Sequence, residues 1–145
     1  MSHSLTKIWI HVIIGVKGRR PLIKDDMFHQ IVGHIEEQMR LVECKPLLIN
    51  GTSDHLHVLY NQSPKISVSD VWKQIKGETS HWINQEDILS NEFNWQVGYG
   101  AFSEGYPGLP RVRRYIENQK AHHKKISFEE ELEEILSRYD LRKDF

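Results

Sequence analysis

Residues 47–60 read LLINGTSDHLHVLY, and this stretch holds two short apolar runs of the kind that form strands. The runs are Leu47 to Asn50 and His55 to Tyr60. Between them, Gly51-Thr52-Ser53-Asp54 has the composition of a hairpin loop. We therefore expect two adjacent antiparallel strands in the middle of the chain.

The flanking sequence extends this hairpin into a larger sheet. Residues 6–16 are rich in β-branched and aromatic side chains, which predicts a first strand. A first helix is indicated by apolar residues at every fourth position, namely Met27, Ile31, Ile35 and Met39. Val68 to Ile83 has helical spacing, and residues 93–102 are predicted as a last strand. The order β-α-β-β-α-β predicts an α+β fold with a ferredoxin-like, or RRM-like, antiparallel sheet.

Two additional helices are predicted at the C-terminal end. No glycine or proline interrupts residues 111–123, and Ser127 with Glu130 matches a capping box at the start of a last helix. We expect one domain over residues 1–145, with the core sheet and its helices at about 5–104. The third helix is expected at about 110–124 and the fourth at about 127–140, its many glutamates forming a solvated outer face.

Composition and length exclude several classes of protein. The chain has 145 residues, and Cys44 is the only cysteine, which excludes an internal disulfide and any multi-cysteine metal site. The longest apolar stretch, Ile8 to Val16, is far shorter than the ~20 residues that span a bilayer. The first residues do not resemble a signal peptide either. A cytoplasmic protein without a membrane partner is expected.

The formal net charge of −1 conceals a strong local asymmetry. Basic residues gather between Tyr106 and Lys125, and acidic ones dominate after Ser127. A local basic surface attracts phosphates even when the whole molecule is nearly neutral. The candidate DNA contacts are Arg111, Arg113, Arg114, Lys73, Lys76 and Lys120, although a solvated surface explains any one of them equally well.

His55 and His57 are the first candidates for chemistry. Side chains alternate along a strand, so both imidazoles share one face about 7 Å apart, and Leu56 points to the other face. Two imidazoles in this arrangement can approach one divalent ion. The alternative is that both histidines occupy the polar face of a half-buried strand. His11, inside an apolar strand, is expected to be a structural histidine of the core or of an interface.

Tyr115 and Gln119 are four residues apart in the predicted third helix and therefore occupy one stripe. The alternative is an amphipathic helix whose tyrosine packs in the core. If the stripe faces His55 and His57, the Gln119 amide oxygen becomes a third ligand and Tyr115 reaches the same centre. Such a mixed nitrogen and oxygen set suits Mg²⁺ or Mn²⁺ bound to a phosphate. A tyrosine beside that ion is a candidate nucleophile for phosphoryl transfer.

These motifs resemble a known family. His55-Leu56-His57 resembles the motif of the HUH endonucleases, and Tyr115-Ile116-Glu117-Asn118-Gln119 resembles the tyrosine helix of their single-tyrosine transposases. The likeness to the TnpA-type transposases of small insertion sequences, and to the REP-associated tyrosine transposase superfamily, covers almost the whole chain. Further matching segments are Arg19-Arg20-Pro21-Leu22-Ile23, Ser67-Val68-Ser69-Asp70, Lys76-Gly77, residues 95–103, His122-His123-Lys124-Lys125 and Phe128-Glu129-Glu130-Glu131.

The resemblance implies a transposase that cleaves and rejoins single-stranded DNA at hairpin-bearing insertion-sequence ends. Tyr115 would form a covalent 5′-phosphotyrosine intermediate, with His55, His57 and Gln119 as metal ligands. It also implies a homodimer in which one subunit's tyrosine helix can complete the other subunit's site. Residues 104–110 depart from the usual lead into that helix. Two alternatives remain, a non-catalytic single-stranded nucleic-acid binding module and a metal-binding regulator of the same fold.

Overall fold

The computed structural model describes residues 4–89 and 91–138. The strands are β1 (Trp9–Gly15), β2 (Lys45–Gly51), β3 (His55–Asn61) and β4 (Gly100–Glu104). The α-helices are α1 (Asp25–Leu41), α2 (Val68–Gln85), α3 (Leu109–Glu117), α4 (Gln119–His122) and α5 (Phe128–Arg138). A short 3-10 turn, η1 (Lys17–Arg19), follows β1, and a second one, η2 (Tyr106–Gly108), precedes α3.

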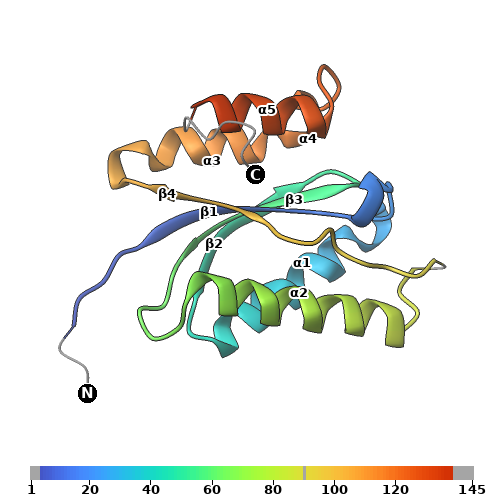
Figure 1. Cartoon of the computed structure of the whole chain (residues 1–145), viewed down its shortest axis with the longest axis horizontal. Coiled ribbons are helices and arrows are strands. Elements are labelled where there is room, and N and C mark those ends of the chain that lie inside the picture. The colour runs from blue at the N-terminus through green and yellow to red at the C-terminus, as the bar shows by residue number, and fades with distance from the viewer. Residues whose placement is uncertain (1–3, 90, 139–145) are drawn as a thin grey trace.

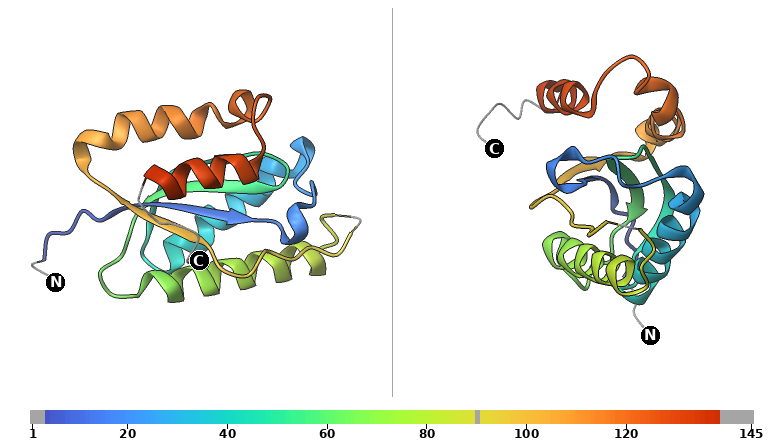
Figure 2. Two further views of the ribbon diagram at one scale, coloured as in Figure 1. Left: turned by 45° about the horizontal axis from the view of Figure 1, so that its top comes forward. Right: turned by 90° about the vertical axis from the view of Figure 1, so that its right-hand side faces the viewer.

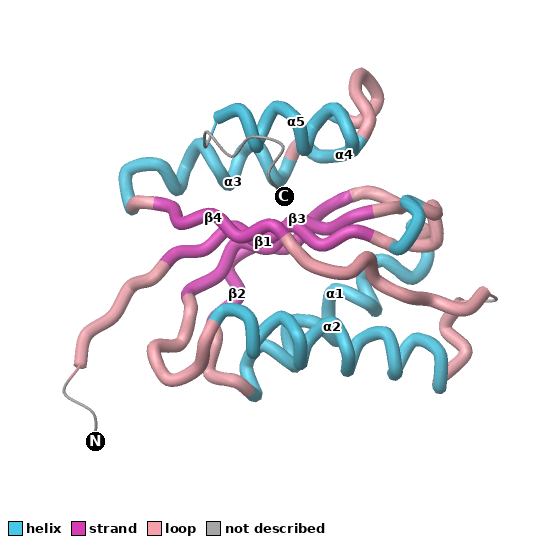
Figure 3. Tube along the Cα trace, viewed as in Figure 1, coloured by secondary structure: helices cyan, strands magenta, loops and turns pink. Residues whose placement is uncertain are grey.

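The strands form one antiparallel sheet in the order β2-β3-β1-β4 (Figure 3). Sequential strands β1 and β2 are therefore separated by β3, and β4 returns beside β1. This is the order of a β-α-β-β-α-β ferredoxin-like sheet, which confirms the predicted α+β fold and the two runs around Gly51-Thr52-Ser53-Asp54 as a hairpin. β1 and β3 lie in the centre of the sheet.

Helices cover both faces of the sheet (Figure 1). α1 and α2 lie against one face, and α3, α4 and α5 lie over the other. Figure 2 shows α3 and α5 side by side above the strands. Among the described residues, no helix is both long and apolar enough to cross a membrane. The molecule is a three-layer arrangement in which the C-terminal helices form the third layer.

Alternation along β3 divides its side chains between the two layers. Leu56, Val58 and Tyr60 belong to the main core with α1 and α2. Leu59, in contrast, packs with Leu109, Val112 and Ile116 of α3. His55 and His57 have the same parity as Leu59, so they face α3, α4 and α5. Since both are fully buried, the face that the sequence indicated as polar is covered by helices.

The predicted last strand over residues 93–102 is wrong for residues 93–99. β4 begins only at Gly100, and before it a single bridge joins Trp95 to Val16. The Asn84 side chain accepts a hydrogen bond from the Phe93 backbone N–H at 2.8 Å and donates one to the Phe93 carbonyl at 2.9 Å. These hydrogen bonds take the place of those that a neighbouring strand would make. The aromatic side chains of Phe93 and Trp95 pack in the main core.

The predicted third helix is two helices, with a break at Asn118. Asn50 of β2 donates hydrogen bonds from Nδ2 to the carbonyls of Ile116, at 2.9 Å, and Glu117, at 3.3 Å. A continuous helix would use these carbonyls for its own N–H groups four residues on. The tertiary contact from β2 therefore ends α3, although no glycine or proline marks the position.

The predicted capping box at the start of α5 is partly formed. The Glu130 N–H donates to Ser127 Oγ at 3.2 Å, as an N-cap requires. The Ser127 hydroxyl also lies 3.3 Å from Glu130 Oε1. α5 ends at Arg138, and residues 139–140 of the predicted helix lie outside the described residues.

Gly51 allows β2 and β3 to approach each other, and this predicts a large effect of Gly51→Ala. An added Cβ would lie 2.2 Å from the His55 carbonyl oxygen and 2.8 Å from Leu56 Cα, so the backbone would have to move. We expect Gly51→Ala to lower the free energy of unfolding, measured with urea, by at least about 1–3 kcal/mol. The control is Gly33→Ala within α1, where a Cβ meets nothing within 4 Å. That variant is expected to gain ~0.5–1 kcal/mol, and equal effects of the two would contradict this account.

Candidate active site

His55 and His57 lie on β3, beneath α4 and α5, and both are fully buried. Their Nε2 atoms point to the same place, since both lie close to Oε1 of Glu131. The distances are 3.1 Å for His55 and 3.0 Å for His57. Two residues of one strand thus present a nitrogen each to one buried point.

Asp54 fixes the orientation of His55. Its Oδ1 lies 2.7 Å from His55 Nδ1, and Thr52 Oγ1 donates to the same carboxylate oxygen at 3.0 Å. A carboxylate accepts, so Nδ1 of His55 carries the proton that it donates. Burial would lower the pKa of His55, but the hydrogen bonds to Asp54 and Glu131 outweigh burial and raise it. Asp54 therefore supports the ring of His55 from the hairpin loop.

His11 plays the same part for His57, which the sequence did not indicate. Its Nε2 lies 2.8 Å from His57 Nδ1, in buried surroundings. Burial, and then the neighbouring His57, lower the pKa of His11 to about 3. Burial also lowers the pKa of His57 to about 4. Both rings are therefore neutral near pH 7, and the neutral imidazole is the form that binds metals.

Tyr115 and Gln119 reach the histidines from α3 and α4, across the break at Asn118. The Gln119 side chain is fully buried, and its Oε1 lies 3.1 Å from His55 Nε2. The Tyr115 hydroxyl donates a hydrogen bond to Oε2 of Glu131, and its ring lies 5.7 Å from that of His57 between centroids. One chain thus brings together all four residues indicated by the sequence.

Glu131 of α5 corrects the expectation that the acidic residues of the last helix form a solvated face. That expectation holds for Glu129, Glu130, Glu133 and Glu134, which are exposed. It is wrong for Glu131, which is fully buried at the centre of the cluster. Its Oε1 also lies 3.1 Å from His123 Nε2, and its Oε2 accepts from Gln119 Nε2 at 2.9 Å. The missed signal is spacing, since Glu131 lies three residues after Phe128 and four before Ile135, both buried.

The protonation of Glu131 and Tyr115 follows from their contacts. Burial would raise the pKa of the Glu131 carboxyl, but hydrogen bonds with His55, His57 and Tyr115 hold it well below its usual range. Burial, and then the contact with Glu131, raise the pKa of the Tyr115 phenol above its usual range. The pair is therefore a carboxylate accepting from a neutral phenol, and this phenol alone is a weak nucleophile.

The donor atoms fit a divalent cation. The imidazole nitrogens of His55 and His57 and the amide oxygen of Gln119 are donor atoms that can bind a divalent metal ion. The buried histidines and Glu131 offer ligand atoms that all lie within 4.8 Å of one another. Asp54 and His11 orient the rings from behind, as partners of metal-binding histidines commonly do.

The predicted DNA contacts lie in different parts of the molecule. Arg111, Arg113, Arg114 and Lys120 are exposed, in the layer that carries Tyr115. Arg111 and Tyr115 also line one hollow of about 130 Å³, together with His11 and Arg138. Lys120 pairs with Asp25 at 3.1 Å.

Lys73 and Lys76 lie on α2, across the sheet from the histidines. Lys76 Nζ donates to the carbonyls of Gln96 and Gly98. In this position it holds the segment before β4.

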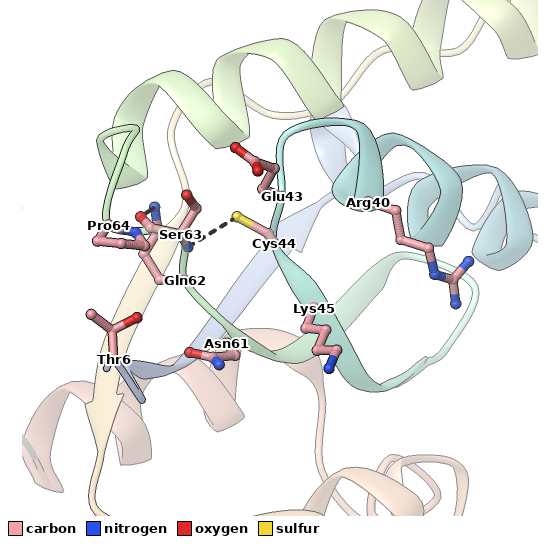
Figure 4. A pocket seen from close by; sticks show the side chains of 9 residues that line it. All are labelled: Thr6, Arg40, Glu43, Cys44, Lys45, Asn61, Gln62, Ser63 and Pro64. Carbon is pink, nitrogen blue, oxygen red and sulfur yellow. Dashed lines mark hydrogen bonds between the residues drawn. The ribbon is translucent and has the colours of Figure 1, made fainter. Parts of the chain in front are cut away.

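A second hollow lies at the other end of β3 (Figure 4). It has a volume of about 290 Å³ and is lined by Arg40, Cys44, Lys45 and Asn61, among others. Cys44 Sγ accepts a hydrogen bond from the Ser63 N–H at 3.5 Å. Asn61 is six residues along the strand from His55 and four from His57, so the hollow is roughly 20 Å from the first histidine and roughly 13 Å from the second. It takes no part in the cluster.

Comparisons with known proteins show the family and the fold of the chain. The family described as "Transposase IS200 like" matches residues 4–119, which include the two histidines, Tyr115 and Gln119 but end before α5. No curated protein matches the chain. One similar structure is a candidate transposase from Deinococcus radiodurans R1, with a TM-score of 0.66 and 18% identity, covering 82% of this chain and 95% of that one.

A second similar structure is a REP-associated tyrosine transposase bound to a REP hairpin. It has a TM-score of 0.65 and 12% identity, covering 87% of this chain and 74% of that one. At such identities the two structures support the fold, whereas the family match extends over most of the sequence. The chain belongs to the family of IS200-like transposases.

Proposed function

We propose that this transposase cleaves and rejoins single-stranded DNA at insertion-sequence ends, with Tyr115 as nucleophile and His55, His57 and Gln119 as ligands of Mg²⁺ or Mn²⁺. The observation that supports it most directly is convergence. The Tyr115 hydroxyl and the Nε2 atoms of both histidines contact the same Glu131 carboxylate. A nucleophile beside a set of metal ligands is an arrangement suited to metal-assisted phosphoryl transfer.

In this proposal the Tyr115 oxygen attacks a backbone phosphorus atom. A bond forms between Tyr115 and the 5′ phosphate, and the bond to the 3′ oxygen breaks and leaves a 3′-hydroxyl. A 3′-hydroxyl of another strand later attacks the phosphotyrosine and restores the phenol. One phosphodiester replaces another, so no ATP is needed. A bound divalent cation would supply charge stabilisation at the phosphate, which a phenol of raised pKa needs.

The chain's own residues have defined tasks in this reaction. Asp54 and His11 hold the two imidazoles, and Gln119 places its oxygen beside His55. Arg111 lies on the wall of the hollow that Tyr115 also lines, where a DNA phosphate can be neutralised. We propose Arg113, Arg114 and Lys120 as further contacts along the same layer, and Lys73 and Lys76 as more remote ones.

Hairpin ends and a homodimer complete the proposal. A REP hairpin is bound by the REP-associated relative, which supports hairpin DNA as the substrate class here. In the sheet, β2 and β4 are the outer strands. An outer strand offers backbone groups for pairing with a second subunit. Light scattering of the purified protein, with and without hairpin DNA, measures the oligomeric state.

The test of the proposed function is the dependence of covalent attachment on metal. Labelled single-stranded DNA with a hairpin is incubated with the protein and analysed on a denaturing gel. With Mg²⁺ or Mn²⁺ we expect a cleaved product and a protein–DNA band. With EDTA we expect both to disappear, and added Mn²⁺ to restore them. Hairpin binding without cleavage in any metal would favour the non-catalytic binding module instead.

A further inference from the structure

Glu131 is a buried acid with an unusual set of neighbours. Among the described residues, Glu131 is the one acidic residue that is fully buried. A buried carboxylate requires compensating partners, and a lysine or arginine is the usual one. Within the described part of the chain, however, every ion-pair partner of Glu131 within 4 Å is a histidine. Its other contacts are the Tyr115 phenol and the Gln119 amide.

The spacing of these groups is that of ligands around one ion. Two ligands at right angles, each ~2.1 Å from Mg²⁺, are about 3.0 Å apart. Glu131 Oε1 lies 3.1 Å from His55 Nε2 and 3.0 Å from His57 Nε2. His55 Nε2 and Gln119 Oε1 are 3.1 Å apart. Glu131 therefore stands in the same geometric relation to the histidines as Gln119 does.

The charge of the site also favours a carboxylate ligand. Two neutral imidazoles and an amide leave a divalent cation without any anionic protein ligand. Mg²⁺ and Mn²⁺ are hard cations, and Mg²⁺ sites usually include one or two carboxylates as well as the substrate phosphate. Glu131 is the carboxylate that can supply this charge, because Asp54 contacts the far side of the His55 ring.

The position of Glu131 is fixed by the packing of α5. The Phe128 ring stacks on His55, with centroids 4.0 Å apart and planes 7° from parallel. Gly15, opposite His55 in the sheet, leaves room for this ring, since a Cβ there would lie 3.0 Å from Phe128 Cε2. One turn beyond Glu131, Ile135 packs with Ile13 and Phe102. Glu131 thus points inward between two apolar anchors.

We propose that Glu131 is a further ligand of the divalent cation, supplied by the C-terminal helix, which rests on the metal site of the proposed function. One carboxylate oxygen lies beside the two histidine nitrogens. The other oxygen accepts the hydrogen bond from Tyr115, so the same side chain places the nucleophile next to the ion. The metal site would then draw on β3, α4 and α5.

The test measures the affinity of the full-length protein for Mn²⁺ without DNA. Calorimetry and the EPR signal of the bound ion report the binding. Glu131→Gln keeps the shape and removes the charge, and we expect it to weaken Mn²⁺ binding by at least ~10–100-fold. Glu131→Ala should be at least as weak, and Glu131→Asp should keep part of the affinity. The matched control is Glu133→Gln, an exposed position in the same helix, which should leave affinity unchanged. Circular dichroism checks that each variant is folded.

His57→Ala separates failure of this inference from failure of the proposed function. If wild type does not bind Mn²⁺, or His57→Ala binds it equally well, the proposed metal site is wrong altogether. If His57→Ala loses binding and Glu131→Gln stays within twofold of wild type, only the role of Glu131 is wrong. Tighter Mn²⁺ binding by Glu131→Gln would likewise overturn the inference, because the carboxylate would then compete with the ion.

Discussion

Tyr115→Phe is expected to eliminate the covalent protein–DNA product and to reduce strand cleavage by at least about a thousandfold, since it removes the only proposed nucleophile. The substitution removes one oxygen and keeps the ring. That ring packs between α3 and the sheet, near His57, His11 and His122, with centroid distances of 5.7, 6.4 and 5.4 Å. The fold and hairpin binding should therefore persist, and a denaturing gel with labelled DNA measures the loss.

Tyr106→Phe is the matched control for this experiment. Tyr106 is 78% exposed and precedes α3, so losing its hydroxyl should change neither product. The decisive result is the state of the DNA in the Tyr115 variant. A covalent band that survives there at wild-type intensity would assign the attachment to another residue and remove Tyr115 from the mechanism.

The sheet was predictable because its strands carry local signals. The runs around Gly51-Thr52-Ser53-Asp54 and the spacing of Ile31, Ile35 and Met39 depend on neighbours in sequence, and the structure agrees with them. The break at Asn118 depends on Asn50, which is 66 residues from the Ile116 carbonyl that it binds. No local pattern can reveal such a contact. The backbone N–H and carbonyl of Phe93 are also hydrogen-bonded to a side chain, that of Asn84, which lies nine residues earlier.

The site was predictable where two candidate residues lie on the same face of a strand or on the same stripe of a helix. His55 and His57 follow strand alternation, and Tyr115 and Gln119 are one turn apart on a helical path. The contact of His11 with His57 was missed, although His11 has the parity of Ile13, which faces the same layer. Only the sheet order reveals its contact, because β1 and β3 become neighbours through the fold. Glu131 was missed because abundant acidic neighbours concealed its place among the buried residues Phe128 and Ile135.

Replacing His57 with alanine is expected to separate chemistry from DNA binding. The side chain is fully buried and contributes Nε2 to the cluster, and the residues that we propose as phosphate contacts are exposed basic residues of other elements. We expect cleavage of hairpin-bearing DNA to fall by at least about a thousandfold, because the proposed cation loses a ligand. Hairpin affinity, measured by fluorescence anisotropy at fixed salt, should change by less than about threefold.

The control for this variant is His81→Ala, at an exposed position of α2 on the opposite face of the sheet, which should cleave like wild type. Because His57 is buried, its removal also leaves a cavity, and thermal unfolding must show that the variant is folded at the assay temperature. Loss of cleavage with retained hairpin binding in a folded protein would mean that His57 serves the reaction. Equal loss of cleavage and binding would mean that it serves the fold, and the metal site would then need a different set of ligands.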